Sequence, residues 1–272
     1  PESPRWLMKA GKEARARQML ERIGSPEYAS RTLNDIAHTL AKDSQRVAFS
    51  TLLQPQVKPV VIMGVVLAIF QQWCGINVIF NYAQEIFASA GFDINGTLKS
   101  IVATGIINLV FTIAALPLVD KLGRRKLMLL GASGLTVIYA LIAGAYALGI
   151  MGWPVLLLVL AAIAIYALTL APVTWVLLAE IFPNRVRGLA MSLATLALWV
   201  ACFLLTYTFP LLNAGLGAAG SFTLYGVICA LGYLYILRNV PETKGVTLEA
   251  LEEQLAAGHQ KSATATNTGR AH

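Results

Sequence analysis

The feature that most constrains this chain is a series of six long apolar runs with almost no charged side chains. They cover roughly residues 59–87, 98–119, 127–149, 153–180, 189–212 and 220–238. A bilayer core is about 30 Å thick, and a helix needs about 20 apolar residues to cross it. Open sheet edges cannot satisfy their backbone hydrogen bonds in lipid. The sequence therefore predicts an all-α membrane protein that contains a bundle of six transmembrane helices.

The composition supports a membrane protein with polar ends. The chain is 57% hydrophobic and 13% charged, with a mean hydropathy of +0.65. Soluble domains carry about 25% charged residues. Most of the charge lies in residues 1–59 and 239–272. The formal net charge of +7 is explained by loops at a membrane surface, so we expect no nucleic-acid partner.

Basic residues occupy alternate loops, and this alternation sets the orientation. Residues 1–59 are rich in Lys and Arg, as is the segment after the last run. Between the runs, the basic loops contribute Lys121, Arg124, Arg125, Lys126, Arg185 and Arg187. The other three loops contain only Lys99. We expect a multi-pass protein of the plasma (inner) membrane, with membrane lipid around it and both ends of this chain in the cytoplasm.

The polar ends are predicted to be simple. Residues 1–56 read as a cytoplasmic linker with short amphipathic helices, in GKEARARQMLERIG and SRTLNDIAHTLAKD. The six transmembrane helices fall in 57–240. A cytoplasmic helix is predicted in 241–256, with Thr247 as its N-cap, and the small polar tail 257–272 is predicted to be disordered.

No catalytic or metal-binding pattern is found. Cys74, Cys202 and Cys229 all lie inside apolar runs without a C-x-x-C pair, so we expect buried thiols rather than a disulfide or metal set. The apolar runs hold no Ser/His/Asp set and no paired acids at mid-depth. We therefore expect no metal, no cofactor and no enzymatic activity.

A cluster of uncharged amides interrupts the first apolar run. Gln71, Gln72 and Asn77 lie near its middle, in QQWCGIN, and Gly75 among them lets the backbone bend. A buried amide without a partner costs about 1–3 kcal/mol, so each needs one. Two interpretations stay open. The amides could line a wet pocket for a neutral, hydroxyl-rich solute, or they could join neighbouring helices.

Two further residues are candidates for the same pocket. Asn108 lies at mid-depth in the second run, and Trp175 lies in LAPVTWVLLAE of the fourth. A Trp ring suits the C–H face of a sugar, although Trp is also common at the membrane interface.

Charged residues gather where cytoplasmic loops meet the spans. Asp120 and Arg124 belong to DKLGRRK, where Gly123 permits a tight turn, and Glu180 and Arg187 belong to AEIFPNRVRG. Opposite charges at one level can pair, and a pair made in only one conformation biases a two-state equilibrium. The alternative is that the arginines only anchor the loops.

Five motifs, in order, connect the chain to a known family. They are PESPRWL, QQWCGINVIFNYA, VDKLGRRK, VLLAEIFPNRVRG and VPETKG. Together they resemble the sugar porter family of the major facilitator superfamily, from residue 1 to about 255. In that family two six-helix halves form an internal repeat, with the first motif after the sixth helix and the last after the twelfth. The resemblance implies that this chain is the central linker plus the C-terminal half, and that an N-terminal six-helix half is its partner.

The resemblance also implies roles for individual residues. Gln71, Gln72, Asn77, Asn108 and Trp175 would contact a monosaccharide. Asp120, Arg124, Glu180 and Arg187 would form a conformational charge network, with Glu2 and Arg5 as further partners. Three positions depart from the family pattern and put the identity of the sugar in doubt: Asn81, Ala171 and Leu198.

We expect half of a pentose or hexose transporter that works by alternating access, by proton-coupled symport or by facilitated diffusion. Any proton-coupling acid would lie in the other half. The alternatives are a sugar sensor that does not transport, and a structural membrane bundle.

Overall fold

The computed structural model describes residues 3–43 and 48–245 and contains only helices and connecting segments there. The chain divides into two compact units, Pro1–Thr51 and Leu52–His272. Glu2, the predicted C-terminal helix from residue 246 onward and the predicted tail lie outside the described residues. All described elements are helical, as predicted.

The first unit is built from α1 (Pro4–Lys9), α2 (Glu13–Glu21) and α3 (Pro26–Asp43). The side chain of Ser3 caps α1 by accepting a hydrogen bond from the Trp6 amide at 3.2 Å. The three helices enclose a small core of Leu7, Ala16, Leu20, Ala29 and Leu33. The helix α2 lies in the first amphipathic stretch, and α3 covers the second but begins four residues before it, at Pro26. The helix α1 was not predicted, because its six residues carry no clear period.

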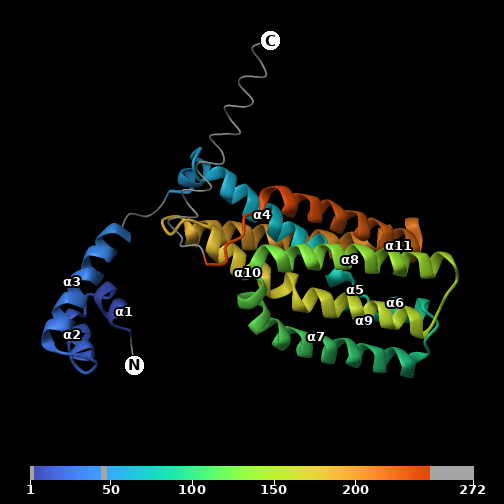
Figure 1. The fold of residues 1–272 in the computed structure, drawn as a ribbon, viewed down its shortest axis with the longest axis horizontal. Coiled ribbons are helices and arrows are strands. Elements are labelled where there is room, and N and C mark those ends of the chain that lie inside the picture. The colour runs from blue at the N-terminus through green and yellow to red at the C-terminus, as the bar shows by residue number, and fades with distance from the viewer. Residues whose placement is uncertain (1–2, 44–47, 246–272) are drawn as a thin grey trace, which may run out of the picture. The chain divides into compact units, whose positions relative to one another are not determined.

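The second unit is the apolar bundle, in which the long helices lie side by side (Figure 1). Its helices are α4 (Lys58–Trp73), α5 (Ile76–Asn81), α6 (Ala83–Ser89), α7 (Ile94–Leu122), α8 (Arg124–Ala147), α9 (Trp153–Leu168), α10 (Leu170–Ile181) and α11 (Arg187–Asn239). The short helix η1 (Phe49–Leu53) spans the boundary between the two units. Among the described residues, five helical stretches are long and apolar enough to cross a membrane.

The difference between five stretches and the six predicted lies in α11. Its 53 residues contain both the fifth and the sixth predicted runs, joined through Gly217 with φ 67° and ψ 179°. The Trp73 indole donates to the Ala201 carbonyl at 3.1 Å, and the Cys229 sulfur lies 3.7 Å from the carbonyl of Cys74. On a straight helix residues 201 and 229 would be about 42 Å apart. The chain therefore reverses at Gly217, and its two limbs, 187–216 and 218–239, occupy the two predicted runs.

Two predicted spans are broken inside. The first span is interrupted between α4 and α5 by Gly75, whose φ of 88° is left-handed. The fourth is interrupted between α9 and α10 at Thr169. Pro172 explains the second break, since a proline ring clashes with the carbonyl four residues earlier, and α9 ends at Leu168.

The helix α7 keeps most of its surface outside the bundle. Val102, Ile106, Leu109, Ile113 and Leu116 are all exposed and apolar. Only 11% of its most apolar window is buried, compared with 67% for the stretch Lys58–Asn81. A surface of this kind suits contact with hydrocarbon better than contact with water.

The break at Gly75 gives a test of the packing. A Cβ there would lie 2.6 Å from the Tyr225 ring, on a backbone that only glycine adopts easily. We expect Gly75→Ala to destabilise the protein by about 1–3 kcal/mol, measured as a lower unfolding temperature in detergent.

Gly105→Ala is the matched control, since nothing lies within 4 Å of its added Cβ and its backbone is helical. It should leave stability unchanged or raise it by up to about 1 kcal/mol. Equal unfolding temperatures for the two variants would contradict the packing described.

Candidate functional site

Three of the predicted amides form a continuous chain of hydrogen bonds across the break in the first span. Gln71 Nε2 donates to the Tyr166 hydroxyl at 2.6 Å, and Gln72 Nε2 donates to Gln71 Oε1 at 2.7 Å. Asn77 Nδ2 donates to Gln72 Oε1 and lies 3.6 Å from the Cys202 sulfur. The amide chain thus joins α4 and α5 to α9 and α11.

The backbone break brings these side chains together. Gln71 and Gln72 lie in the last turn of α4, which ends at Trp73, and Asn77 lies in the first turn of α5. Gln72 and Asn77 are five positions apart in the sequence. On an unbroken helix their side chains would lie on different faces and could not meet. The left-handed Gly75 changes that direction, so the amide of Asn77 reaches Gln72.

Burial divides the amide chain into an inner and an outer part. Gln71 and Gln72 are 4% and 6% exposed, whereas Asn77 is half-buried. The inner amides have partners within the bundle, as the helix-joining interpretation requires. Of the three hydrogen-bonded amides, Asn77 is the one with accessible surface.

The structure does not connect the other two predicted contact residues to this chain. Asn108 is half-buried on α7, and Trp175 on α10 is 38% exposed. Neither forms a hydrogen bond with the amides in the part of the chain that is described. The Asn81 amide, which departs from the family pattern, contacts the Thr206 hydroxyl at 3.4 Å.

Tyr166 was missed by the sequence reasoning. It is 7% exposed and supplies the hydroxyl that ends the amide chain. A tyrosine at mid-depth of an apolar run is itself a signal, because a buried hydroxyl needs a partner. The pattern could have suggested a polar contact, but not that its partner lies 95 positions away.

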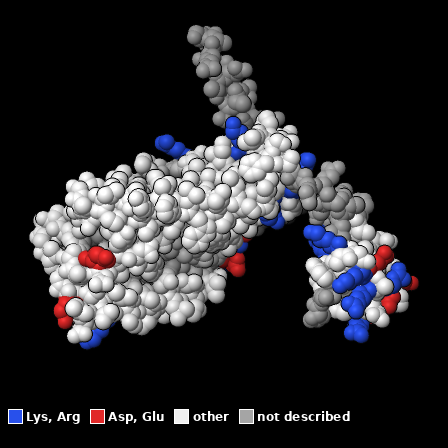
Figure 2. All heavy atoms as spheres, turned by 180° about the vertical axis from the view of Figure 1, so that it is seen from behind, with Lys and Arg blue, Asp and Glu red and all other residues white. Residues whose placement is uncertain are grey.

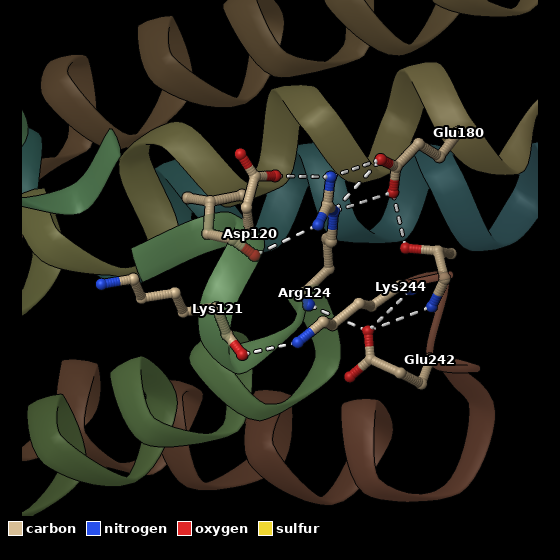
Figure 3. Close-up of polar contacts among 8 residues, drawn as sticks. Asp120, Lys121, Arg124, Glu180, Glu242 and Lys244 are labelled. Carbon is tan, nitrogen blue, oxygen red and sulfur yellow. Dashed lines mark hydrogen bonds and ion pairs between the residues drawn. The ribbon is translucent and has the colours of Figure 1, made fainter. Parts of the chain in front are cut away.

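At the other candidate cluster, Arg124 lies between two acidic side chains (Figure 3). Its Nε is 3.1 Å from both carboxylate oxygens of Glu180, and its Nη2 is 2.9 Å from Glu180 Oε1. The same Nη2 lies 3.3 Å from Asp120 Oδ1. Because Arg124 is 13% exposed and Glu180 28%, solvent screens this pair less than an open surface pair.

The segment after α11 closes over the α7–α8 loop. Glu242 Oε1 accepts the amide of Arg124, the first residue of α8, at 2.9 Å. Lys244 Nζ donates to the Lys121 carbonyl at 2.6 Å, at the last turn of α7. An acid at a helix start and a base at a helix end both complement the helix dipole. The Thr243 hydroxyl donates to Glu180 Oε2 at 2.6 Å.

Gly123 makes this close approach possible. It has φ 91°, and a Cβ there would lie 2.7 Å from Glu242 Oε2. The sequence predicted a tight turn at this glycine but did not predict the carboxylate that packs on it. Glu242 belongs to the motif VPETKG, which the sequence analysis noted. Its contact with the start of α8 could be recognised only from the structure.

Among the described residues of the bundle, the Arg187 side chain contacts a backbone carbonyl rather than this cluster. Arg187 Nε donates to the Phe182 carbonyl at 3.2 Å, and its Nη2 is buried without a hydrogen-bond partner in the described residues. Arg5 belongs to the first unit, and Glu2 lies outside the described residues.

Charged side chains are distributed unevenly along the bundle. Figure 2 shows few charged side chains along the middle of the bundle on the face it presents, and more toward its ends. Across 3–43 and 48–245, no group of three or more His, Cys, Asp or Glu could hold a metal ion. The cysteines Cys74, Cys202 and Cys229 are free thiols.

The cap on α8 gives a second prediction. We expect Glu242→Ala to lower stability by about 0.5–2 kcal/mol, since it removes the acceptor for the α8 amide. Glu242→Gln keeps an oxygen in place and loses only the charge, so it should cost about 0.3–1 kcal/mol. Thermal unfolding in detergent measures both, and an Ala variant as stable as the unchanged protein would contradict the capping role.

Comparison with known proteins gives a consistent result. A family model described as "Sugar (and other) transporter" matches residues 1–255. The D-xylose-proton symporter of Escherichia coli strain K12 is 40% identical over 258 residues, covering 93% of this chain and 52% of that protein. The arabinose-proton symporter of Bacillus subtilis strain 168 is 35% identical over 254 residues, covering 93% of this chain and 54% of that protein.

Solved structures show the same likeness. The major facilitator superfamily proton:xylose symporter XylE bound to 6-bromo-6-deoxy-D-glucose superposes with a TM-score of 0.74 at 37% identity, covering 94% of this chain and 54% of that one. The inward open conformation of XylE from E. coli gives a TM-score of 0.71 at 36% identity, covering 93% and 52%. The chain thus spans about half the length of these relatives, which are transporters rather than enzymes. It belongs to the sugar transporter family of the major facilitator superfamily.

Proposed function

We propose that this chain forms the C-terminal half of a monosaccharide transporter that works by alternating access. The relatives named for xylose and arabinose support a pentose or a hexose as the substrate. Their coverage of about half supports a six-helix N-terminal half as the partner. The two halves would move against one another around a site near the middle of the membrane.

The observation that carries this proposal is the amide chain at the break in the first span. Amides both donate and accept hydrogen bonds, as sugar hydroxyls do, and they carry no charge. Asn77 is half-buried and is the outermost of the three hydrogen-bonded amides. A sugar hydroxyl could therefore replace one of its present partners. The exposed ring of Trp175 would pack against the apolar face of the sugar.

The placement of acids bears on proton coupling. In the described spans, Glu85, Asp120 and Glu180 are found toward helix ends rather than at mid-depth. A coupling acid would then be supplied by the N-terminal half, as symport in the named relatives suggests. Facilitated diffusion remains the second possibility for the complete protein.

The orientation follows from the basic loops. Arg124 and Lys244 lie at the same end of the bundle as Glu180, and Arg185 follows the end of α10 at Ile181. We assign this end to the cytoplasm of an inner-membrane protein. Both ends of the chain would lie on that side. The exposed apolar surface of α7 would contact lipid.

The Arg124 cluster would act as a latch between conformations. It joins α7, α8, α10 and the segment after α11 through Asp120, Glu180 and Glu242. A contact of this kind stabilises a conformation only by the free energy that it loses in the other one. Arg187, Glu2 and Arg5 are proposed to join it in another state of the complete protein.

A structural bundle without transport is the competing function, because Gln71 and Gln72 already have partners inside the bundle. Variants of the complete protein distinguish a transporter from a structural bundle. In the transporter, Gln71→Ala and Asn77→Ala should abolish saturable sugar uptake, since each removes a group that holds the sugar.

Tyr166→Phe is the matched control for Gln71→Ala. It breaks the same hydrogen bond but leaves the amide present. If Gln71 only joins helices, both variants should lower stability and leave sugar affinity unchanged. Gln71→Ala should then cost more than Tyr166→Phe, because it also removes the acceptor of Gln72 Nε2. If Gln71 holds sugar, tryptophan quenching by sugar should be lost only in Gln71→Ala. Quenching without any uptake in the unchanged protein would favour a sensor.

The latch gives a separate prediction. Arg124→Lys keeps the charge but loses the bidentate contact with Glu180. Because the latch would then hold its conformation less well, the maximal uptake rate should fall several-fold. Arg125→Lys is the control, because within 3–43 and 48–245 the Arg125 side chain donates to the backbone carbonyl of Leu237, at 2.7 Å, and pairs with no carboxylate. Uptake kinetics measure both, and equal rates for the two variants would contradict the latch.

A further inference from the structure

A small cavity lies away from the amide chain, where α6 meets both limbs of α11. Its lining includes Ile86 and Ser89 of α6, Phe209 before the Gly217 reversal, and Ser221 and Tyr225 after it. The Ser89 oxygen is 3.1 Å from the hydroxyl of Tyr146, near the C-terminal end of α8. Since α8 begins at Arg124, the cavity is at the opposite end of the bundle from the Arg124 cluster.

Two hydroxyls in the cavity wall lack partners. Ser221 and Tyr225 are each 1% exposed, and neither side-chain oxygen has a hydrogen-bond partner among the described residues. Burying a hydroxyl without a hydrogen-bond partner is unfavourable, so each of these two groups favours a partner inside the cavity. Both belong to the same limb of α11, four residues apart, and so lie on one face of it.

The size of the cavity limits what it can hold. Its volume is about 20 Å³. A water molecule needs at least about 10–15 Å³, whereas a six-carbon ring occupies a cavity on the order of 150 Å³. A sugar is therefore excluded, and a single water fits.

We propose that this cavity is a binding site for one ordered water molecule, hydrogen-bonded to the hydroxyls of Ser221 and Tyr225. Buried waters characteristically bond about three polar groups that are otherwise unsatisfied. Glu85 and Asn213, which also line the cavity, supply further polar atoms. The site is separate from the proposed sugar contacts and does not depend on them.

The water would connect the outer part of the broken first span to the second limb of α11. The Tyr225 ring already packs against Gly75, where that span is broken. A water held by Tyr225 and Ser221 next to α6 would extend this contact past the break. The position of α5 and α6 would then depend on hydration of the cavity as well as on packing.

X-ray radiolytic footprinting with mass spectrometry tests the proposal on the complete protein in nanodiscs. Hydroxyl radicals form from bound water and oxidise the side chains next to it. We expect Tyr225 to be oxidised several-fold faster than Tyr139, which is also buried, with an unpartnered hydroxyl, but is not part of the cavity wall. Equal oxidation of the two tyrosines would overturn the proposal.

A variant pair adds a second readout. Ser221→Ala removes one partner of the water and should lower Tyr225 oxidation several-fold. Thr223→Ala is the control, because the Thr223 hydroxyl is exposed and donates to the Ala219 carbonyl. Tyr225 oxidation that is unchanged in Ser221→Ala would also overturn the proposal. If that variant does not fold, the comparison of Tyr225 with Tyr139 in the unchanged protein still decides.

Discussion

The main constraint on the bundle is that polar groups inside an apolar layer need hydrogen-bond partners. Helices pair their own backbone groups, so the problem remains at helix breaks and at polar side chains. At the break in the first span, Gln71, Gln72 and Asn77 are paired through one another and Tyr166. The same requirement turns the α7–α8 loop into a structured site, where Glu242 and Lys244 pair with a helix start and a helix end. Both candidate sites are therefore places where helices end or break.

This shared origin explains why packing and function are hard to separate in this family member. A hydrogen-bonded amide stabilises the bundle whether or not a sugar later replaces its partner. The inner amides, Gln71 and Gln72, are fixed within the bundle, whereas Asn77 has exposed surface. Such a gradient suits a site that is held rigid on one side and exchanges partners on the other. The Arg124 cluster has a similar gradient, since Asp120 is largely exposed and Arg124 largely buried.

The sequence was most informative where the physics is local. Apolar length predicted the spans, and Gly75 predicted the bend in the first of them. Side-chain partners were not predictable, because Tyr166 lies 95 positions from Gln71 and Glu242 lies 118 from Arg124. The reversal at Gly217 was predicted as a loop, and the structure needs a single glycine for it. Arg187 shares a motif with Glu180, yet its local backbone directs it to Phe182.

The reversal at Gly217 has a mechanical consequence. A loop of several residues would let two neighbouring spans tilt independently, because the loop absorbs the difference. One glycine joins 187–216 to 218–239, and both limbs contact consecutive residues, Trp73 and Cys74, at the break in the first span. The two limbs are therefore fastened to two adjacent residues, so a displacement of the break would be transmitted to both limbs together.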